Sequence, residues 1–257
     1  MRPILFEAFG LRASSAPVFA GLAAALAYAY FELRRRDLAC SEEDFWGLIG
    51  ALAFGVFAGS LAAYALLCPG GRWNLAFWSG GLAIPGGSFL GALPGAAASA
   101  ALYARLRRLP FGPVADVLAA AAPLGLVLMR VGCLLNGCCH GAPTGGAWGA
   151  VFTGPCDVPA ELRGIPLHPT QLYEAAGALA IFLVVDRFVR PRAASGALRP
   201  GDGLWIMTAL YCVLRFSVDF VRAPHAAALS APGLNAVQWA CLAAAAASGA
   251  FLLRRRA

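Results

Sequence analysis

Long apolar stretches alternate with short polar ones along the whole chain. Seven of them are close to the roughly 20 residues that a helix needs to cross the hydrocarbon core of a bilayer. They cover residues 16–33, 46–67, 80–103, 114–133, 169–189, 202–222 and 233–253. This pattern predicts an all-α integral membrane protein with seven transmembrane helices. Because no long polar linker interrupts the pattern, residues 1–257 are expected to form a single helical bundle.

Composition supports the same class of protein. Hydrophobic residues make up 60% of the chain, charged residues make up 13%, and the mean hydropathy is +0.70. About a quarter of the residues in a typical soluble domain are charged, so the composition argues against a soluble fold. The formal net charge of +7 does not by itself indicate a nucleic-acid partner, and none is expected.

The distribution of arginines predicts how the helices are oriented. Thirteen of the twenty arginines lie at the far ends of the first, third, fifth and seventh stretches, on one side of the membrane. They are Arg34, Arg35, Arg36, Arg105, Arg107, Arg108, Arg187, Arg190, Arg192, Arg199, Arg254, Arg255 and Arg256. The opposite side holds Arg2, Arg12, Arg72 and Arg163. Cytoplasmic loops are rich in basic residues, so we expect the N-terminus outside, the C-terminus in the cytoplasm, and the long polar segment 134–168 outside.

Five of the charged residues that lie inside the apolar stretches or at their ends are candidates for a functional site. They are Arg130, Glu174, Arg215, Asp219 and Arg222. A charge at membrane depth is costly, so such residues usually face a bundle interior or a polar cavity and mark a functional site. In the predicted topology all five lie towards the outer side, and this predicts one polar pocket there.

Helical spacing places several polar residues on common faces. Gln171 and Glu174 are three residues apart and therefore share a face. At about 100° per residue, four polar residues of the sixth stretch fall within about 80° of one another. They are Tyr211, Arg215, Asp219 and Arg222. Three converging arginines would suit a lipid phosphate, because guanidinium groups bind phosphate through paired hydrogen bonds. The alternative is a buried ion-pair network that only holds helices together.

Cysteines and histidines supply further candidate chemistry. A dense group after Arg130 contains Cys133, Cys138, Cys139 and His140. Its spacing fits no standard zinc pattern, so no metal is expected. A disulfide, for example to Cys156, a reactive thiol and neutral packing stay open as alternatives. His168 is either a proton carrier near neutral pH or a hydrogen-bonded structural residue. The other cysteines, Cys40, Cys68, Cys212 and Cys241, are typical of small apolar positions.

Three ordered motifs resemble those of the prolipoprotein diacylglyceryl transferase family. The first is RVGCLLNG at 130–137, followed by GAPT at 141–144 and WG at 148–149. The second is HPTQLYE at 168–174, and the third is YCVLRFSVDFVR at 211–222. The resemblance spans roughly residues 80–222. Because the motifs are long and occur in order, we do not attribute the similarity to chance.

The resemblance implies a fold and a reaction. The fold is a seven-helix bundle of the bacterial inner membrane, with its site facing the periplasmic side. The reaction is transfer of a diacylglyceryl group from phosphatidylglycerol to the lipobox cysteine thiol of a preprolipoprotein, which yields a thioether and glycerol phosphate. No cofactor is implied. The implied partners are phosphatidylglycerol, a preprolipoprotein signal peptide and the surrounding membrane lipids.

The resemblance also implies roles for individual residues. Arg130 and Arg215 match two essential arginines of the family, and Glu174 and His168 complete the expected catalytic set. The expected substrate-binding residues are Asn136, Gly137, Cys138, Gln171, Tyr211, Asp219 and Arg222. Fixed arginine donors would stabilise the negative charge that accumulates as a phosphate ester leaves. The incoming thiol must lose its proton to become a good nucleophile.

The chain departs from the family pattern in the third-helix motif and at three other positions. The third-helix motif Ser-Phe-His-Gly-Gly of the family is AIPGG at 83–87 here, so Pro85 replaces a functionally important histidine. Cys138 stands where the family has an acidic residue, Cys133 where it has an asparagine, and Asp219 is a shorter acid than usual. Two other functions therefore stay open. One is a transferase of this fold with another acceptor or lipid, with Cys138 or Cys139 near the reacting centre, and the other is a non-catalytic protein that binds or transports phospholipid.

Overall fold

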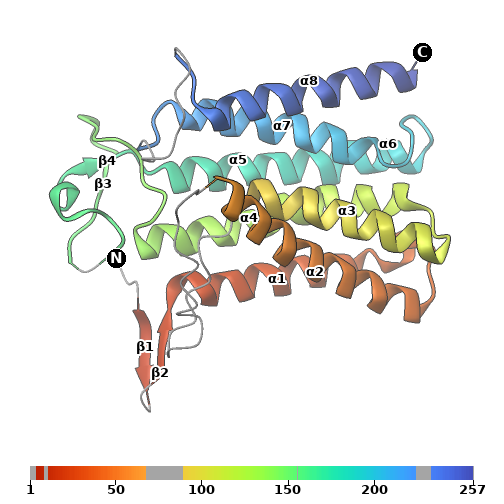
Figure 1. Cartoon of the computed structure of the whole chain (residues 1–257), viewed down its shortest axis with the longest axis horizontal. Helices are drawn as coiled ribbons and strands as arrows, with labels where there is room; N and C mark the ends of the chain where they lie inside the picture. The colour runs from red at the N-terminus through yellow and green to blue at the C-terminus, as the bar shows by residue number, and fades with distance from the viewer. Residues whose placement is uncertain (1–3, 9–10, 68–88, 155, 224–232, 257) are drawn as a thin grey trace.

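The structure is a computed structural model that describes residues 4–8, 11–67, 89–154, 156–223 and 233–256. Its long helices lie side by side and run between two opposite ends (Figure 1). They are α1 (Ser15–Leu33), α2 (Glu42–Leu67), α3 (Phe89–Arg107), α4 (Phe111–Asn136), α5 (Thr170–Val184), α7 (Asp202–Asp219) and α8 (Ala236–Arg256). Each of the seven predicted apolar stretches coincides with one of these helices, so the helical prediction is confirmed. Residues 80–88 of the third stretch lie outside the described residues.

Within the described residues, four of the helices are long and apolar enough to cross a membrane. They are Ser15–Leu33, Glu42–Ala63, Phe111–Asn136 and Ala236–Arg255. The others are shorter or more polar for identifiable reasons. α5 has 15 residues before its geometry changes, and α7 carries charges at Asp202, Arg215 and Asp219.

The fifth helical segment extends past the predicted end of its apolar stretch at residue 189. α5 continues through a π-helical turn, Val185–Val189, into α6 (Arg190–Ala194). The charged side chains in this region end the apolar stretch, but they do not end the helix. Asp186 and Arg190 lie one turn apart and form an ion pair of 2.6 Å, which supports continued helix.

The two ends of the bundle differ in chemistry. One end holds the α1–α2, α3–α4 and α6–α7 connections and the C-terminal end of α8 (Figure 1). These are the places where the thirteen clustered arginines occur in the sequence. Here Asp186 accepts a hydrogen bond of 2.6 Å from the Tyr30 hydroxyl and pairs with Arg34 at 3.2 Å. This network joins α1 to the fifth helical segment.

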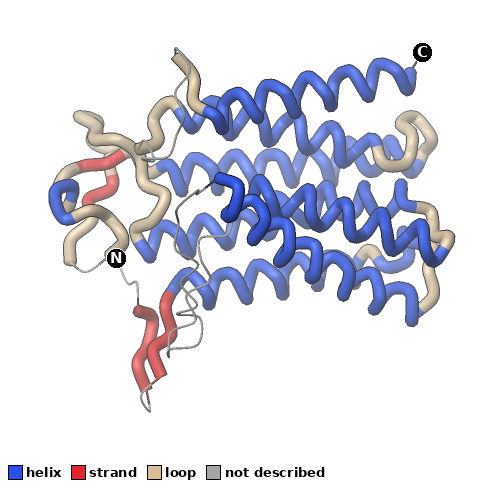
Figure 2. Tube along the Cα trace, in the orientation of Figure 1, coloured by secondary structure: helices blue, strands red, loops and turns tan. Residues whose placement is uncertain are grey.

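The opposite end carries short strands that the hydrophobic pattern did not predict (Figure 2). β1 (Ile4–Ala8) pairs with β2 (Leu11–Ser14), and β3 (Ala150–Val151) pairs with β4 (Pro166–Leu167), both antiparallel. The second hairpin lies within the predicted polar segment 134–168. Phe152, Val158 and Leu167 are fully buried there and form a small core of their own, so this segment is folded.

Glycines allow α2 and α3 to approach each other closely. A Cβ atom at Gly59 would lie 2.3 Å from the carbonyl oxygen of Gly91, and one at Gly55 would lie 2.3 Å from that of Gly95. The Ser99 hydroxyl donates a hydrogen bond of 2.7 Å to the Ala51 carbonyl across the same interface. Small residues and interhelical hydrogen bonds are the usual means by which helices associate in a membrane.

Replacing Gly59 by alanine tests this close approach. The new methyl group would meet the backbone of α3, which cannot move aside as a flexible side chain can, so we expect the free energy of unfolding to fall by about 2 kcal/mol. Gly50→Ala is the matched control, because a Cβ at Gly50 in the same helix has no atom within 4 Å. Thermal unfolding in detergent compares the two variants. Equal midpoints for both would contradict the described packing.

Candidate active site

Glu174 is the centre of the charged cluster predicted from the sequence. Its side chain is only 1% exposed and lies in the second turn of α5. One carboxylate oxygen pairs with Arg130 Nη2 at 2.5 Å, and the other pairs with Arg222 Nη1 at 2.6 Å. Arg130 comes from α4 and Arg222 follows the end of α7. A single carboxylate therefore joins three segments that are far apart in the chain.

Backbone hydrogen bonds hold Arg222 in place. Gly141 and Arg222 form an antiparallel bridge, and the Ala142 N–H donates to the Val221 carbonyl at 2.9 Å. On the other side of this segment, the Gly141 N–H donates a hydrogen bond to the His168 carbonyl, and the His168 N–H donates one to the Ala142 carbonyl. Each is 2.9 Å long. A Cβ at Gly141 would lie 2.5 Å from both His168 Cβ and the Val221 carbonyl oxygen. Glycine at this position therefore lets the start of α5 and the end of α7 meet.

A second ion pair lies on α7. Arg215 and Asp219, one turn apart, are joined at 2.5 Å, and both side chains are buried. Asp219 also accepts a hydrogen bond from the Asn235 side chain. Asn235 was not predicted from the sequence. It precedes α8 and exchanges hydrogen bonds with Gln238, at 2.9 and 3.0 Å. An Asn-x-x-Gln pattern before an apolar helix resembles a capping box, so this spacing could have identified Asn235 from the sequence.

The cluster has a net positive charge. Arg130, Arg215 and Arg222 face two carboxylates, which leaves one positive charge in a buried setting. Within the described residues, the Nε atoms of Arg130 and Arg222 have no hydrogen-bond partner. Tyr211 is also buried, one turn before Arg215 on α7. A buried excess positive charge with free donors is suited to a monoanion such as a phosphate diester.

Other predicted site residues serve the loop beside this cluster. The Gln171 side chain donates a hydrogen bond of 2.7 Å to the Cys138 carbonyl. The Asn136 side chain donates to Asp157, and Gly137, with φ of 82°, ends α4 in the left-handed conformation. The His168 ring makes a hydrogen bond of 3.2 Å with the Tyr173 hydroxyl. These hydrogen bonds are local, and none of them reaches the paired arginines.

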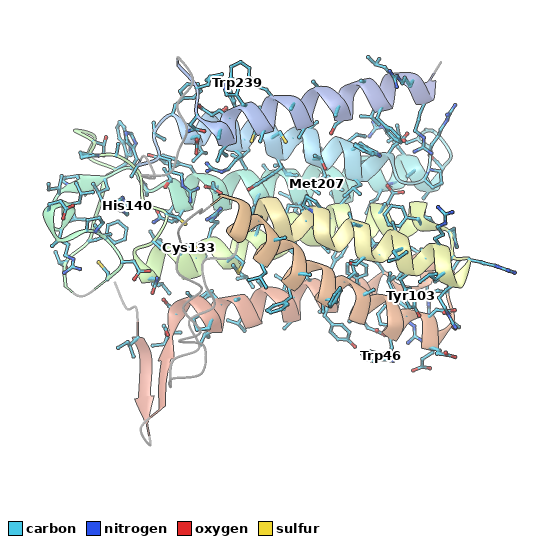
Figure 3. All side chains as sticks on the ribbon, in the orientation of Figure 1. Trp46, Tyr103, Cys133, His140, Met207 and Trp239 are labelled. Atoms are coloured by element: carbon cyan, nitrogen blue, oxygen red, sulfur yellow. The ribbon has the colours of Figure 1, made fainter. Side chains whose placement is uncertain are left out.

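Three cysteines come together next to the cluster. The sulfur atoms of Cys133, Cys138 and Cys139 all lie within 4.8 Å of one another, and Cys133 Sγ is 3.9 Å from Arg130 Nη1. Figure 3 shows Cys133 and His140 towards the end of the bundle that carries β3 and β4. Hydrogen bonds from the other two thiols, together with the nearby guanidinium charges, lower the pKa of the Cys139 thiol.

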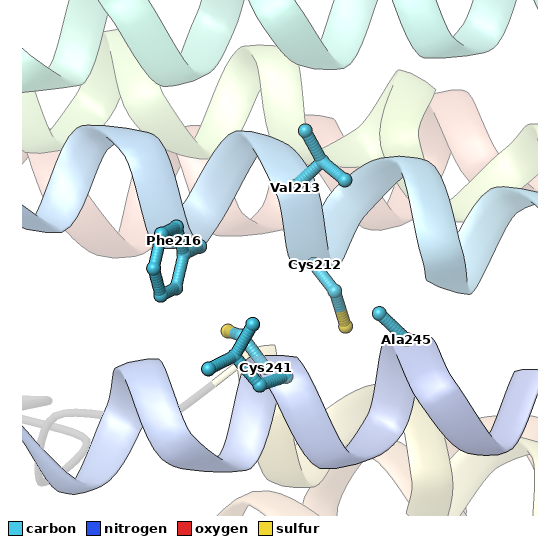
Figure 4. A pocket seen from close by; sticks show the side chains of 6 residues that line it. Cys212, Val213, Phe216, Cys241 and Ala245 are labelled. Carbon is cyan, nitrogen blue, oxygen red and sulfur yellow. The ribbon is translucent and has the colours of Figure 1, made fainter. Parts of the chain in front are cut away.

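The described cysteines form no disulfide, so Cys156 is a free thiol. It packs against Gly137, where an added Cβ would lie 3.3 Å from its sulfur. Cys212 and Cys241 both line a hollow of about 90 Å³ between α7 and α8 (Figure 4). Its remaining lining is apolar, with Val213, Phe216, Leu242 and Ala245. This hollow therefore does not provide the polar pocket that the sequence predicts.

Comparison with known proteins gives a family match over nearly the whole chain. A model of the prolipoprotein diacylglyceryl transferase family matches residues 3–254. A phosphatidylglycerol–prolipoprotein diacylglyceryl transferase of Geobacter sulfurreducens is 34% identical over 214 residues, which are 77% of this chain and 74% of that protein. A protein of the same name from Polynucleobacter asymbioticus is 30% identical over 86% of this chain and 81% of its own length. One from Cupriavidus pinatubonensis is 36% identical over 64% of this chain and 55% of its own length.

Replacing Glu174 by glutamine tests the central ion cluster. Two buried guanidinium groups would lose their shared counter-charge, so we expect the free energy of unfolding to fall by about 3 kcal/mol. Glu161→Gln is the control, because Glu161 is exposed and its neutral replacement should be silent. Chemical or thermal unfolding in detergent measures both variants. If Glu174→Gln is as stable as the control, Glu174 does not neutralise buried charge in the folded protein.

Proposed function

Because the chain belongs to the prolipoprotein diacylglyceryl transferase family, we propose that it transfers a diacylglyceryl group from phosphatidylglycerol to the lipobox cysteine of a preprolipoprotein. The function expected from the sequence motifs is confirmed at the level of the family and of the names its relatives carry. The chain is accordingly a membrane-bound transferase of lipoprotein biosynthesis. The preprolipoprotein signal peptide as its partner in the membrane is part of the proposal.

The observation that carries the proposal is the excess positive charge of the buried cluster. The phosphate group of phosphatidylglycerol is a diester with one negative charge. This charge would balance the one positive charge by which the three arginines exceed the two carboxylates. Within the described residues, Arg130 Nε and Arg222 Nε have no hydrogen-bond partner. The uncompensated charge therefore favours an anion-binding site over a purely structural role.

The chemistry places particular demands on this site. The cysteine sulfur forms a bond to a glycerol carbon, the bond from that carbon to the phosphate oxygen breaks, and glycerol phosphate leaves. Negative charge grows on the departing oxygen, where positioned guanidinium donors lower the barrier. Glu174 holds Arg130 and Arg222 in fixed orientations, so little reorganisation is needed when this charge develops. The acceptor thiol gives up its proton to a base.

Roles for the remaining predicted residues follow from their positions. Arg215, oriented by Asp219, acts as a second clamp on the phosphate, and Tyr211 is buried one turn before Arg215 on α7. Gln171, through the Cys138 carbonyl, keeps the loop after α4 against α5. His168 lies beside this loop as a candidate proton carrier. Pro85, which replaces the family histidine, lies outside the described residues.

The proposed location is the bacterial inner membrane, crossed by all seven long helices, with the N-terminus outside, the C-terminus in the cytoplasm and the site facing the periplasm. This orientation is supported by the thirteen arginine positions gathered at one end of the bundle. The Glu174 cluster lies towards the opposite end, near β3 and β4.

A turnover assay tests the function. The purified protein is given phosphatidylglycerol and a lipobox peptide, and glycerol phosphate release is followed. We expect turnover by the unchanged protein and a loss of at least about 100-fold in kcat/KM for Arg130→Ala, because a principal phosphate donor is removed. Arg130→Lys keeps the charge but loses the forked geometry, so it should also be impaired while remaining folded.

Arg36→Ala is the control for these variants, since Arg36 is exposed at the other end of the bundle. It should turn over like the unchanged protein. Phosphatidylglycerol binding without any glycerol phosphate release would refute the transferase proposal and favour a protein that only binds lipid. Release with a different acceptor thiol alone would favour the altered transferase.

Reporter fusions test the orientation. A green fluorescent protein joined after residue 257 should fluoresce, because the C-terminus is proposed to lie in the cytoplasm, whereas alkaline phosphatase at the same point should be inactive. Alkaline phosphatase inserted at Gly154, in an exposed turn of the segment carrying β3 and β4, should be active. The reverse pattern would show that the bundle has the opposite orientation.

A further inference from the structure

The three-cysteine cluster beside the arginines has a geometry that the transferase reaction does not use. Cys133 lies in the last turn of α4, and Cys138 and Cys139 lie in the loop that follows. Their three sulfur atoms are within 4.8 Å of one another. We propose that these thiols bind a single thiophilic metal ion, Zn²⁺ or Cu⁺. The thiols lie next to the proposed phosphate site, and Cys133 Sγ is 3.9 Å from Arg130 Nη1, but ion binding can be measured without the transferase activity.

The sulfur positions suit one shared ion. Metal–sulfur bonds of about 2.3 Å around a trigonal centre place the sulfur atoms about 4 Å apart. The separations found here therefore need only a small contraction. In a disulfide the two sulfur atoms would be about 2 Å apart, and all three cysteines are free thiols. A shared ion fits this arrangement with less movement than a covalent bond between two of the sulfurs.

The backbone holds the loop in the shape that gathers the thiols. Side chains of adjacent residues point to opposite sides of an extended strand, yet the sulfurs of Cys138 and Cys139 are close. Cys139 has a φ of 61°, in the left-handed region that residues other than glycine seldom adopt. Thr170 and Gln171, in the first turn of α5, donate hydrogen bonds of 2.5 and 2.7 Å to the carbonyls of Cys139 and Cys138. The loop conformation and its hydrogen bonds therefore hold the three thiols close together without a bound ion.

The surrounding charges favour thiolate ligands. Three thiolates around a divalent or monovalent ion form a complex with a net negative charge. Cys133 Sγ lies 3.9 Å from Arg130 Nη1, and the Arg130–Glu174–Arg222 cluster carries an excess positive charge. The negative complex would thus have an adjacent counter-charge. Soft thiolate ligands select Zn²⁺ and Cu⁺ over hard ions such as Mg²⁺ and Ca²⁺, which defines the class of ion.

A binding experiment on the full-length protein in detergent tests the site. The protein is reduced with a phosphine, stripped with a chelator and titrated with Zn²⁺ or Cu⁺ against a chromophoric competitor, with Mg²⁺ as a negative control. We expect one equivalent of ion to bind. Cys138→Ser and Cys139→Ser should each weaken binding at least about tenfold, since changes to groups that merely orient metal ligands already cost 10–100-fold. Cys156→Ser, a matched change outside the cluster, should bind like the unchanged protein.

Alkylation of the unchanged protein, followed by mass spectrometry, gives a readout that does not depend on the folding of any variant. The bound ion should slow the alkylation of Cys133, Cys138 and Cys139 but not that of Cys40, which lies at the other end of the bundle. Absence of one-equivalent binding for both ions, or unchanged binding by the Cys139→Ser protein, would overturn the proposal. So would recovery of two of the three cysteines as a disulfide from the reduced protein once the reductant is removed in the presence of the ion.

Discussion

A single buried carboxylate organises the end of the bundle where we propose the functional site. Glu174, 1% exposed, binds Arg130 of α4 and Arg222 beyond α7. Charges are costly to place in an apolar surrounding unless they are paired. The three segments that carry these side chains must therefore pack together at the level of Glu174 in the bundle. The same constraint explains why the cluster can carry function, because two arginines held by one carboxylate keep donors available for an anion.

The loop between α4 and α5 depends on this meeting point. It begins at Gly137, passes Cys138 and Cys139 and pairs through Gly141 with the backbone at Arg222. Thr170 and Gln171 fix the same loop from the first turn of α5. The loop thus has contacts on both sides with segments that supply the ion cluster. A change in the loop, whether by substitution or by a bound ion, is expected to reach Arg130 and Arg222 through these contacts.

The sequence allowed the helices and the charged residues of the site to be predicted, because both follow from local rules. Apolar stretches of membrane length form helices. A charge such as Glu174 inside one of them is costly to bury, so it usually faces the bundle interior or a polar cavity. The pairing of Glu174 with two arginines was not predictable in this way, since it depends on how α4, α5 and α7 pack. The continuation of the fifth segment beyond residue 189 is supported by an ion pair between residues one turn apart, at a place where the apolar stretch has already ended. The hydrogen bond from Asn235 to Asp219 joins two separate helical segments and could not be read from local spacing. The proximity of Cys133 to Cys138 and Cys139 depends on the turn at Gly137 and on the unusual φ of Cys139, which spacing alone does not reveal.

The central claim is that the arginines held by Glu174 receive a lipid phosphate. The most direct measurement is the thermal unfolding midpoint of the purified protein as phosphatidylglycerol is titrated, with zwitterionic phosphatidylethanolamine as the reference lipid. A ligand that binds only the folded state raises this midpoint as its concentration increases. The account predicts a larger rise with phosphatidylglycerol than with the reference lipid, and a much smaller difference for Arg222→Lys, which loses forked recognition. Equal rises with both lipids, or an undiminished difference in Arg222→Lys, would contradict it.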